Sequence, residues 1–546
     1  MVAAAMAGSA YDYIVIGAGS AGCVVANRLS ADPKRSVLLI EAGGRDRHPL
    51  VQLPMLMGKL MHSRLYNWQY ETEPEPELDG RQVYWPRGKA LGGSSTINGM
   101  IYVRGNRRDY DRWAQLGLSG WSYAEVLPYF RKSEGHVERR DAFHGAGGPL
   151  TVCRARGKNP LFDLFVEAGR QAGYPVNDDF NGEEQEGFGR YDFTIRDGKR
   201  CSASKAFLRP ILGRPNLVVA THALTERIVI EGGRAVAVEY RRNGESFHAR
   251  ADREIVLSAG AINSPQILML SGVGGADELA THGVKLAHHL PGVGKNLQDH
   301  VDVCLVYEAV KPVTLYSDLR ADRLVPAILR GFLLGDGVAT TFPYEGGAFL
   351  KSRPGLESPD IQAHFMPALE KTANLHWPKL FSKAKVEDNH GVTIRIGPLN
   401  PESRGAIALR SAKPDDPPRI FANYLSTEFD KQTTLAGVRM LRDVMAQKAF
   451  GDIIGKELAP GAALRSDAEL RQWLKSAGGT TLHPVGTCKM GCDAMAVVDE
   501  KLKVRGLEGL RVADASIMPI IPSGNTNGPT IMIGEKAADM IIQADD

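Results

Sequence analysis

The sequence contains no run of the roughly 18 uninterrupted apolar residues that a helix needs to span a bilayer. Cysteine is scarce, with six residues in a chain of 546, and only Cys488 and Cys492 lie close together. Because no second cysteine pair accompanies these two, the sequence predicts neither a zinc site nor a disulfide framework. The net charge of +3 is near balance, which argues against a nucleic-acid partner.

Basic residues are also missing from the N-terminus, where a secretory signal peptide would need them. Residues 1–10 are mostly small, and an apolar strand pattern follows directly. We interpret this segment as a frayed leader. Without a targeting signal or a membrane span, the expected location is the cytoplasm. A chain of this length is expected to form two or more domains.

Glycine, by contrast, is abundant, with 59 residues, and the first cluster follows an apolar strand pattern at residues 13–16. Gly17, Gly19 and Gly22 form the spacing Gly-x-Gly-x-x-Gly, and residues 23–29 continue as a helical pattern. In a dinucleotide-binding β-α-β unit the first glycine permits a tight turn, the second lets backbone amides approach a pyrophosphate, and the third lets the helix pack on the strand. The pattern therefore predicts nucleotide binding at the N-terminus of this helix.

An acidic residue completes the same unit. Residues 37–40 are apolar and predict a second strand, and Glu41 ends it, about 20 residues after the glycines. A carboxylate at this place suits the ribose diol of an adenosine. The unit by itself leaves open whether the nucleotide is FAD or NAD.

A second glycine-rich stretch lies at residues 87–99, where two glycines precede three hydroxyl residues and an asparagine. Small side chains and exposed backbone amides allow a ligand to approach closely, so one interpretation is a ligand-binding loop. The other is a helix N-terminus with no ligand. Composition alone does not separate the two.

The middle of the chain has a different character. Residues 361–366, 392–396 and 406–410 alternate with period two, as half-buried strands do, and residues 435–445 predict a helix with one apolar face. We expect an α+β domain, built around a sheet, that covers the cofactor. An apolar stretch at residues 324–334 is compatible with a lid or core helix and also with contact to a membrane surface.

Two further expectations concern the segments between these parts. Residues 216–220, 227–230 and 235–240 have the pattern of strands in an antiparallel meander. The helix that follows is expected to be capped by Ser264, with Pro265 at its first helical position, where proline is well tolerated.

Taken together, these blocks resemble the glucose–methanol–choline (GMC) family of flavin oxidoreductases over nearly the whole chain. The first family signature matches residues 88–98, the second matches residues 260–274, and a C-terminal block around His483 matches as well. Within the family the sequence looks most like the bacterial choline dehydrogenase and aliphatic alcohol dehydrogenase group. The resemblance implies FAD, a Rossmann-like α/β domain that binds it, and an α+β substrate-binding domain built on an antiparallel sheet.

The domains that the resemblance implies are discontinuous. The FAD-binding domain is expected to comprise residues 11–155, 200–305 and 478–546. The substrate-binding domain is expected to comprise residues 156–199 and 306–477.

The resemblance also implies which residues bind FAD. The first glycine motif and Glu41 would hold the ADP half, the first signature would lie along the ribityl chain and the flavin ring, and Val219 would meet the adenine through its backbone. Because Ile97 stands where some members carry the histidine that binds flavin covalently, the FAD is expected to be non-covalent. The implied FAD-binding residues are Gly17, Gly19, Ser20, Ala21, Gly22, Glu41, Ala42, Trp68, Gly92, Gly93, Ser94, Ser95, Asn98, Gly99, Met100, Ile101, Val219, Asp514, Ala515, Asn527, Pro529 and Thr530.

The implied reaction is oxidation of a primary alcohol to an aldehyde by hydride transfer to flavin N5, with electrons passed on to a quinone or another acceptor. It needs a base near neutral pH to remove the hydroxyl proton, and histidine is the usual choice. His483 matches the catalytic histidine of the family, and Asn525 matches the second active-site position, where it would bind the developing alkoxide. His300, in another family-like block, is interpreted as structural. The enzyme is expected to be a monomer or a homodimer.

Several alternatives stay open at this point. Glu345, beside Tyr344 in the expected substrate pocket, could face the ammonium of choline or make buried hydrogen bonds. An oxygen-using oxidase of aryl or furfuryl alcohols and a non-redox hydroxynitrile-type lyase would share the same fold. The light-driven fatty-acid decarboxylase branch lacks the catalytic histidine, so His483 argues against it.

Overall fold

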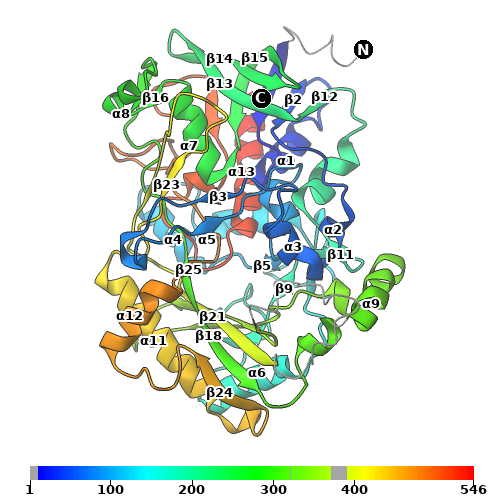
Figure 1. Ribbon diagram of the computed structural model, residues 1–546. Helices are drawn as coiled ribbons and strands as arrows, with labels where there is room; N and C mark the ends of the chain where they lie inside the picture. Colours follow the sequence, from blue (N-terminus) through cyan, green and yellow to red (C-terminus); the bar gives the residue numbers. More distant parts are fainter. Residues whose placement is uncertain (1–9, 320, 370–389, 546) are drawn as a thin grey trace.

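The computed structural model describes residues 10–319, 321–369 and 390–545, which build two large sheets (Figure 1). Of the leader expected at residues 1–10, residues 1–9 lie outside the described residues, and Ala10 is the first residue of β1 (Ala10–Ile16). One sheet occupies the upper half of Figure 1 and the other the lower half. A cavity lined from both sides lies between them and is described below.

The upper sheet is the predicted nucleotide-binding layer. Its parallel part contains the two strands predicted on either side of the first glycine motif. All residues of the second strand are buried, which explains why its sequence is continuously apolar instead of alternating. Across the sheet the order is β12 (Leu217–Thr221), β2 (Val37–Glu41), β1 (Ala10–Ile16), β15 (Glu245–Leu257), β14 (Arg234–Arg242) and β13 (Ala223–Glu231), and β26 (Leu510–Val512) pairs with β15.

The prediction that residues 216–220 belong to the antiparallel meander is wrong, because this segment forms β12 elsewhere in the sheet. It lies parallel to β2, with Leu217 opposite Val37, and only β13, β14 and the first half of β15 are antiparallel neighbours. The reason lies in the single residue that separates β12 from β13. His222 has a φ of 54°, in the left-handed region, so the chain turns sharply there and the two strands do not form a hairpin.

Helices cover this sheet, and one of them begins earlier than predicted. α7 (Gly260–Leu270) starts four residues before Ser264, and Pro265 lies inside it. The carboxylate of Asp514 accepts hydrogen bonds from the backbone N–H of Gly260 at 2.8 Å and from the Ser264 hydroxyl at 2.5 Å, so it anchors the helix start in place of the predicted serine cap. Nearby, α13 (Asn527–Asp545) packs on α1 (Ser20–Leu29) and on α5 (Tyr123–Ser133).

The lower sheet is antiparallel throughout, as the resemblance implies. The predicted strand at residues 361–366 is present with the same bounds, and α6 (Leu161–Gln171), α11 (Glu428–Met445) and α12 (Asp467–Ala477) pack around the sheet. The predicted domain boundary at residue 305 falls inside β18. The strand order is β24 (Ile454–Ala459), β18 (Val301–Ala309), β21 (Gly391–Pro398), β20 (Ile361–Met366), β19 (Gly346–Leu350) and β8 (Gly187–Arg190), and β25 (Gly479–Thr480) pairs with the start of β18.

The apolar stretch at 324–334 belongs to α9 (Ala321–Leu334), which projects at the right of Figure 1. One side of this helix packs on Leu53 and Leu56, whose neighbour Met57 lines the cavity. The other side leaves Leu329 56% and Leu333 80% exposed. Within the described ranges, no helix is both long enough and apolar enough to cross a membrane.

Candidate active site

The first glycine motif forms the turn between β1 and α1, and the structure explains its spacing. Gly17 has a φ of 94°, which favours glycine. A Cβ on Gly22 would lie 1.9 Å from the carbonyl oxygen of Gly17, so only glycine fits there. A Cβ on Gly19 would have its nearest neighbour at 3.8 Å, and this residue lines the cavity. The turn and packing roles predicted for Gly17 and Gly22 are confirmed.

The second glycine stretch lies against the first. The backbone N–H of Gly92 donates to the carbonyl of Ala18 at 2.7 Å, and a Cβ on Gly93 would lie 2.7 Å from the Cα of Gly19. Gly19 is the N-cap of α1 and supplies no side-chain cap, so the first-turn N–H groups have no partner within the helix, and the two glycine loops form a cradle at this helix end. An anionic group fits this cradle because the helix dipole favours negative charge there.

Glu41 closes one side of the cradle. Its carboxylate accepts hydrogen bonds from the backbone N–H of Ala18 at 2.9 Å and of Gly43 at 2.8 Å. Burial raises the pKa of Glu41 to about 7, and these two bonds oppose the shift. Glu41 lines the cavity at the end of β2, and its binding to a ribose stays a prediction.

The cavity has a volume of about 810 Å³ and extends from this cradle to the antiparallel sheet. It lies at the upper end of the range for ligand-binding cavities, as a dinucleotide with a substrate would require. The predicted site residues that line it are Gly17, Gly19, Ser20, Ala21, Glu41, Ala42, Trp68, Gly93, Ser94, Asn98, Gly99, Met100, Ile101, Tyr344, His483, Asp514, Ala515, Asn525, Asn527 and Thr530.

Five residues predicted to bind the cofactor do not line this cavity. Gly22 packs against the backbone of Gly17, and Gly92 packs against the side chains of Thr96 and Ser204. The Ser95 hydroxyl faces inward, where it donates to the carbonyl of Gly92 and accepts from the N–H of Ala203. Val219 lies on β12, and the cavity wall at this place is formed by residues 223–225 of β13. The five residues are Gly22, Gly92, Ser95, Val219 and Pro529.

Strand pairing brings His483 beside His300. β25, which ends just before His483, pairs with the first residues of β18, which begins just after His300. The backbone N–H of His483 donates to the buried carboxylate of Asp299 at 2.6 Å. Leu482 has a φ of 66°, an uncommon conformation for a bulky residue, which this pairing and the Asp299 bond hold in place.

His483 and Asn525 meet in the cavity. The side-chain nitrogen of Asn525 lies 3.1 Å from Nε2 of His483, although the two residues come from different parts of the fold. Gln362 on β20 donates to the Asn525 carbonyl oxygen at 3.2 Å. Burial lowers the pKa of His483 well below its ordinary value, and neighbouring positive groups add to this effect. The ring is therefore a neutral imidazole, which can accept a proton.

The cavity residues that were not predicted include two ionisable side chains of the antiparallel sheet. His364, on β20, stacks on Tyr191 with 5.2 Å between ring centroids, and burial lowers its pKa to about 3. Arg395, on β21, pairs with Asp302 at 2.5 Å. The period-two pattern located both strands but predicted them as half-buried, whereas β20 is buried on both faces and β21 is buried at every residue except Arg395.

Glu345, predicted in the substrate pocket, does not line the cavity. Its side chain is 1% exposed and accepts hydrogen bonds from the N–H of Gly157 at 2.8 and 3.0 Å. The same carboxylate pairs with the guanidinium of Arg190 at 2.5 Å. Burial raises the pKa of Glu345 and Arg190 opposes this, so the acid is held by a cation of the protein itself.

Comparison with known families agrees with this geometry. Residues 11–302 match the N-terminal model of the GMC oxidoreductases, and residues 401–534 match the C-terminal model. The chain belongs to the GMC oxidoreductase family. It is 46% identical over 536 residues to the oxygen-dependent choline dehydrogenase of Brucella anthropi, covering 97% of this chain and 95% of that one. The mitochondrial choline dehydrogenase of Homo sapiens is 46% identical, covering 97% and 89%.

Solved structures of two oxidases share the fold. Pyridoxine 4-oxidase from Mesorbium loti has a TM-score of 0.87 at 32% identity, covering 98% of this chain and 99% of its own. Formate oxidase from Aspergillus oryzae has a TM-score of 0.90 at 27% identity, with the same coverage. The protein is thus an FAD-dependent oxidoreductase that acts on alcohols. The double glycine cradle, with its uncapped helix N-terminus, fits the pyrophosphate of FAD.

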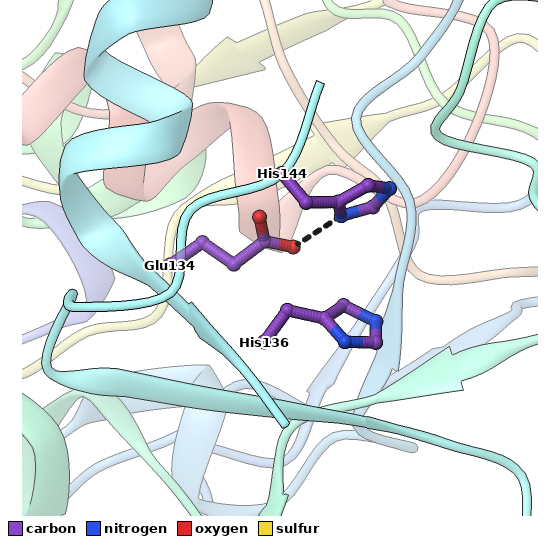
Figure 2. Close-up of side chains that lie close together, drawn as sticks. All are labelled: Glu134, His136 and His144. Atoms are coloured by element: carbon purple, nitrogen blue, oxygen red, sulfur yellow. Dashed lines mark hydrogen bonds and ion pairs between the residues drawn. The ribbon is translucent and has the colours of Figure 1, made fainter. Parts of the chain in front are cut away.

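This GMC oxidoreductase also has a cluster of possible metal ligands, Glu134, His136 and His144 (Figure 2). His144 bridges two carboxylates, with Nδ1 at 3.1 Å from Glu134 and Nε2 at 3.0 Å from Asp179. Glu134 also pairs with Arg104 at 2.7 Å. With both nitrogens of His144 and the Glu134 carboxylate already paired, the cluster has the character of a buried ion network.

The charge of His144 predicts a pH-dependent stability. Although burial opposes the charge, the bonds to Asp179 and Glu134 raise the pKa of His144 to about 9. A raised pKa stabilises the fold fully below the ordinary value, about 6.5, and this contribution is lost as the pH rises through about 9. His144→Ala should cost about 3 kcal/mol of unfolding free energy at pH 6.5 and less at pH 9.5, measured by urea unfolding. His282→Ala, which changes a partly exposed histidine, is the control, and equal losses at both pH values would contradict the charge.

Proposed function

We propose that this GMC oxidoreductase oxidises an uncharged primary alcohol to an aldehyde, with His483 as the base. The observation that carries the base assignment is the neutral imidazole of His483, whose Nε2 lies beside Asn525 inside the cavity. FAD, when bound, supplies the acceptor for the hydride that leaves the alcohol carbon. His483 takes the hydroxyl proton at Nε2, and the amide N–H of Asn525 stabilises the oxygen as it gains negative charge.

The apolar part of the cavity supports an uncharged substrate. Met57, Ile101, Phe342 and Tyr344 line it and belong to one hydrophobic cluster, which would hold the body of an alcohol and keep water away from the reacting oxygen. Phe342 and Tyr344 also offer aromatic faces to a quaternary ammonium, so the group that would distinguish the two substrates is an anionic partner. Glu345 is the acid expected for that role, and Arg190 already compensates its charge.

A second candidate is choline, because the choline dehydrogenases named above are 46% identical to this chain. The two candidates differ in what they require of Glu345. Choline would gain an anionic partner only if this carboxylate left Arg190 and turned toward the cavity. Oxidation of an uncharged alcohol needs no such change.

Anaerobic flavin bleaching tests both candidates. The FAD-loaded enzyme is mixed with octanol, benzyl alcohol or choline, and the loss of visible flavin absorbance is followed. We expect the uncharged alcohols to bleach the flavin at least ~10-fold faster than choline. Arg190→Gln, which releases Glu345, should narrow that difference. Faster bleaching by choline in the unaltered enzyme would contradict the proposal, and no bleaching by any alcohol would favour a lyase.

The electron acceptor is part of the same proposal. We infer that electrons pass to a quinone or another carrier and not to oxygen. The test is to admit air after bleaching: flavin that stays reduced supports the carrier, whereas rapid recovery with hydrogen peroxide would show an oxidase.

The exposed side of α9 supports a peripheral contact with the cytoplasmic surface of a membrane, where a quinone would be found. Val325, Leu329 and Leu333 form a stripe along it at a spacing of four residues and are 43%, 56% and 80% exposed. Leu333→Asp should weaken binding to sedimented anionic vesicles about 30-fold, because one buried leucine contributes about 2 kcal/mol. Leu116→Asp, at another exposed leucine, should leave binding unchanged. Absence of vesicle binding by the unaltered protein would contradict the contact.

A further inference from the structure

His300 has both ring nitrogens in hydrogen-bonding contact. Nε2 lies 2.9 Å from the carbonyl oxygen of Leu399, and Nδ1 lies 3.0 Å from Nδ1 of His483. The side chain is buried, and burial lowers its pKa to about 4, so the ring is neutral and has one N–H and one lone pair. A carbonyl only accepts. The N–H of His300 is therefore on Nε2, and its Nδ1 is an acceptor.

The state of His483 follows from this. Because Nδ1 of His300 accepts, the N–H of His483 must be on Nδ1, and the lone pair is left on Nε2. Thr481 also favours a proton on Nδ1 of His483. Its hydroxyl donates to the carbonyl of His300 at 3.1 Å, and its oxygen lies 3.1 Å from Nδ1 of His483 as a second acceptor.

The hydrogen bonds at the Nε2 edge of the His483 ring indicate the same tautomer. Gln362 donates to the carbonyl oxygen of Asn525, which turns the Asn525 N–H groups toward Nε2 of His483. Gln362 is oriented in turn by Tyr191, whose hydroxyl donates to the carbonyl of Ala363 and accepts from the Gln362 amide. A donor therefore faces Nε2 while two acceptors face Nδ1. Both sides select the same tautomer.

We propose that His300 is a positioning residue that fixes His483 in the tautomer whose Nε2 lone pair faces the cavity. The inference deepens the proposed function, because it rests on His483 being the base. His300 makes no contact with substrate in this role. It decides which nitrogen of the neighbouring ring is free to take the hydroxyl proton.

The other ionisable groups around His483 do not supply this control. The carboxylate of Asp299 accepts from the backbone N–H of His483, and its second oxygen is bonded by Thr480 and Tyr424. The positive charges of Arg87 and Arg395 lower the proton affinity of the ring. His364 also lies near the ring and is neutral. The acceptors at Nδ1 are His300 and Thr481.

Two substitutions at His300 separate positioning from packing. His300→Leu removes the acceptor, whereas His300→Gln keeps one acceptor and one donor in a planar amide. In FAD-loaded enzyme, His300→Leu should slow anaerobic flavin reduction at least ~10-fold with little change in substrate dissociation constant; loss of the partner that fixes a catalytic histidine tautomer can cost up to ~10⁴-fold. His300→Gln should recover most of the rate.

The pH profile provides the readout that a packing role would not change. Protonated His483 donates a stronger bond through Nδ1, so losing the acceptor lowers its proton affinity. The ascending limb of the reduction rate should therefore move to lower pH in His300→Leu and return in His300→Gln. Thr481→Val should move the limb in the same direction by a smaller amount, which tests the proposal even if His300→Leu does not fold.

Equal losses of rate in the Leu and Gln variants, with an unchanged pH profile, would overturn the proposal. So would a normal reduction rate in FAD-loaded His300→Leu. Failure of the proposed function looks different, because His483→Ala would then reduce at a normal rate as well. FAD content and melting temperature, measured on every variant, ensure that only folded, loaded protein is compared.

Discussion

Replacing His483 with alanine should leave FAD bound and slow flavin reduction by an alcohol at least ~10²-fold, the lower end for a lost general base. The expected size follows from the surroundings of the ring. His483 is buried and neutral, and its Nε2 faces the cavity beside Asn525. The variant keeps the oxyanion partner but has no group to take the hydroxyl proton. Anaerobic stopped-flow mixing, followed by flavin absorbance, measures the rate directly.

Added imidazole offers a matched control for that variant. The substitution leaves a cavity the size of the lost ring, so imidazole should restore part of the rate in His483→Ala and leave the unaltered enzyme unaffected. His282→Ala, at a partly exposed histidine that follows α8 (Ala276–Thr281) and does not line the cavity, should reduce at the normal rate. Near-normal reduction by FAD-loaded His483→Ala would contradict its assignment as the base.

Replacing Gly22 with alanine should yield protein that retains little FAD and has lost at least ~3 kcal/mol of unfolding free energy, the upper end for overpacking. The added Cβ would lie 1.9 Å from the carbonyl oxygen of Gly17. That oxygen belongs to the backbone, so no side-chain rotation relieves the contact. α1 would have to move away from β1, and the cradle for the pyrophosphate would open. FAD absorbance of the purified protein and thermal unfolding measure the two effects.

Substitutions at two other glycines separate the effect of packing on stability from the effect of cofactor contact on FAD affinity. Gly19→Ala places its Cβ 3.8 Å from the nearest atom, toward the cavity, so it should lower FAD affinity while the apoprotein keeps its stability. Gly213→Ala, with no atom within 4 Å, should change neither. Gly22→Ala with full FAD content and unchanged melting temperature would refute the packing argument.

Much of the fold could be predicted because local sequence and tertiary structure agree. The apolar strands around the first glycine motif, and the strand at residues 361–366, appear where their patterns place them. Predictions failed where a distant residue decides a local outcome. α7 begins at Gly260 because Asp514, about 250 positions away, binds its first N–H. β12 leaves the predicted meander because His222 turns the chain through a left-handed conformation.

The candidate site, too, could be predicted only in part. The resemblance placed His483 and Asn525, and the structure brings them into contact. The resemblance could not reveal the ion pair between Arg190 and Glu345. These two residues are 155 positions apart and are brought together by the register of β8 and β19. The resemblance also could not reveal that His300, interpreted as structural, touches the His483 ring. That contact depends on strand pairing between β18 and β25, and neither strand has an unusual pattern.

Asn525 has a consequence for how substrate reaches the cavity. The residue leads into α13, which packs on α1 in the nucleotide-binding layer, yet its side chain is bonded to Gln362 of the antiparallel sheet and to His483. A hinge motion that parted the two sheets would therefore pull the catalytic pair apart. Turnover needs the two sheets to stay together, so substrate must enter and product must leave through a local movement. The segment placed for such a movement is α9 with Leu53 and Leu56, on which it packs, because the adjacent Met57 lines the cavity.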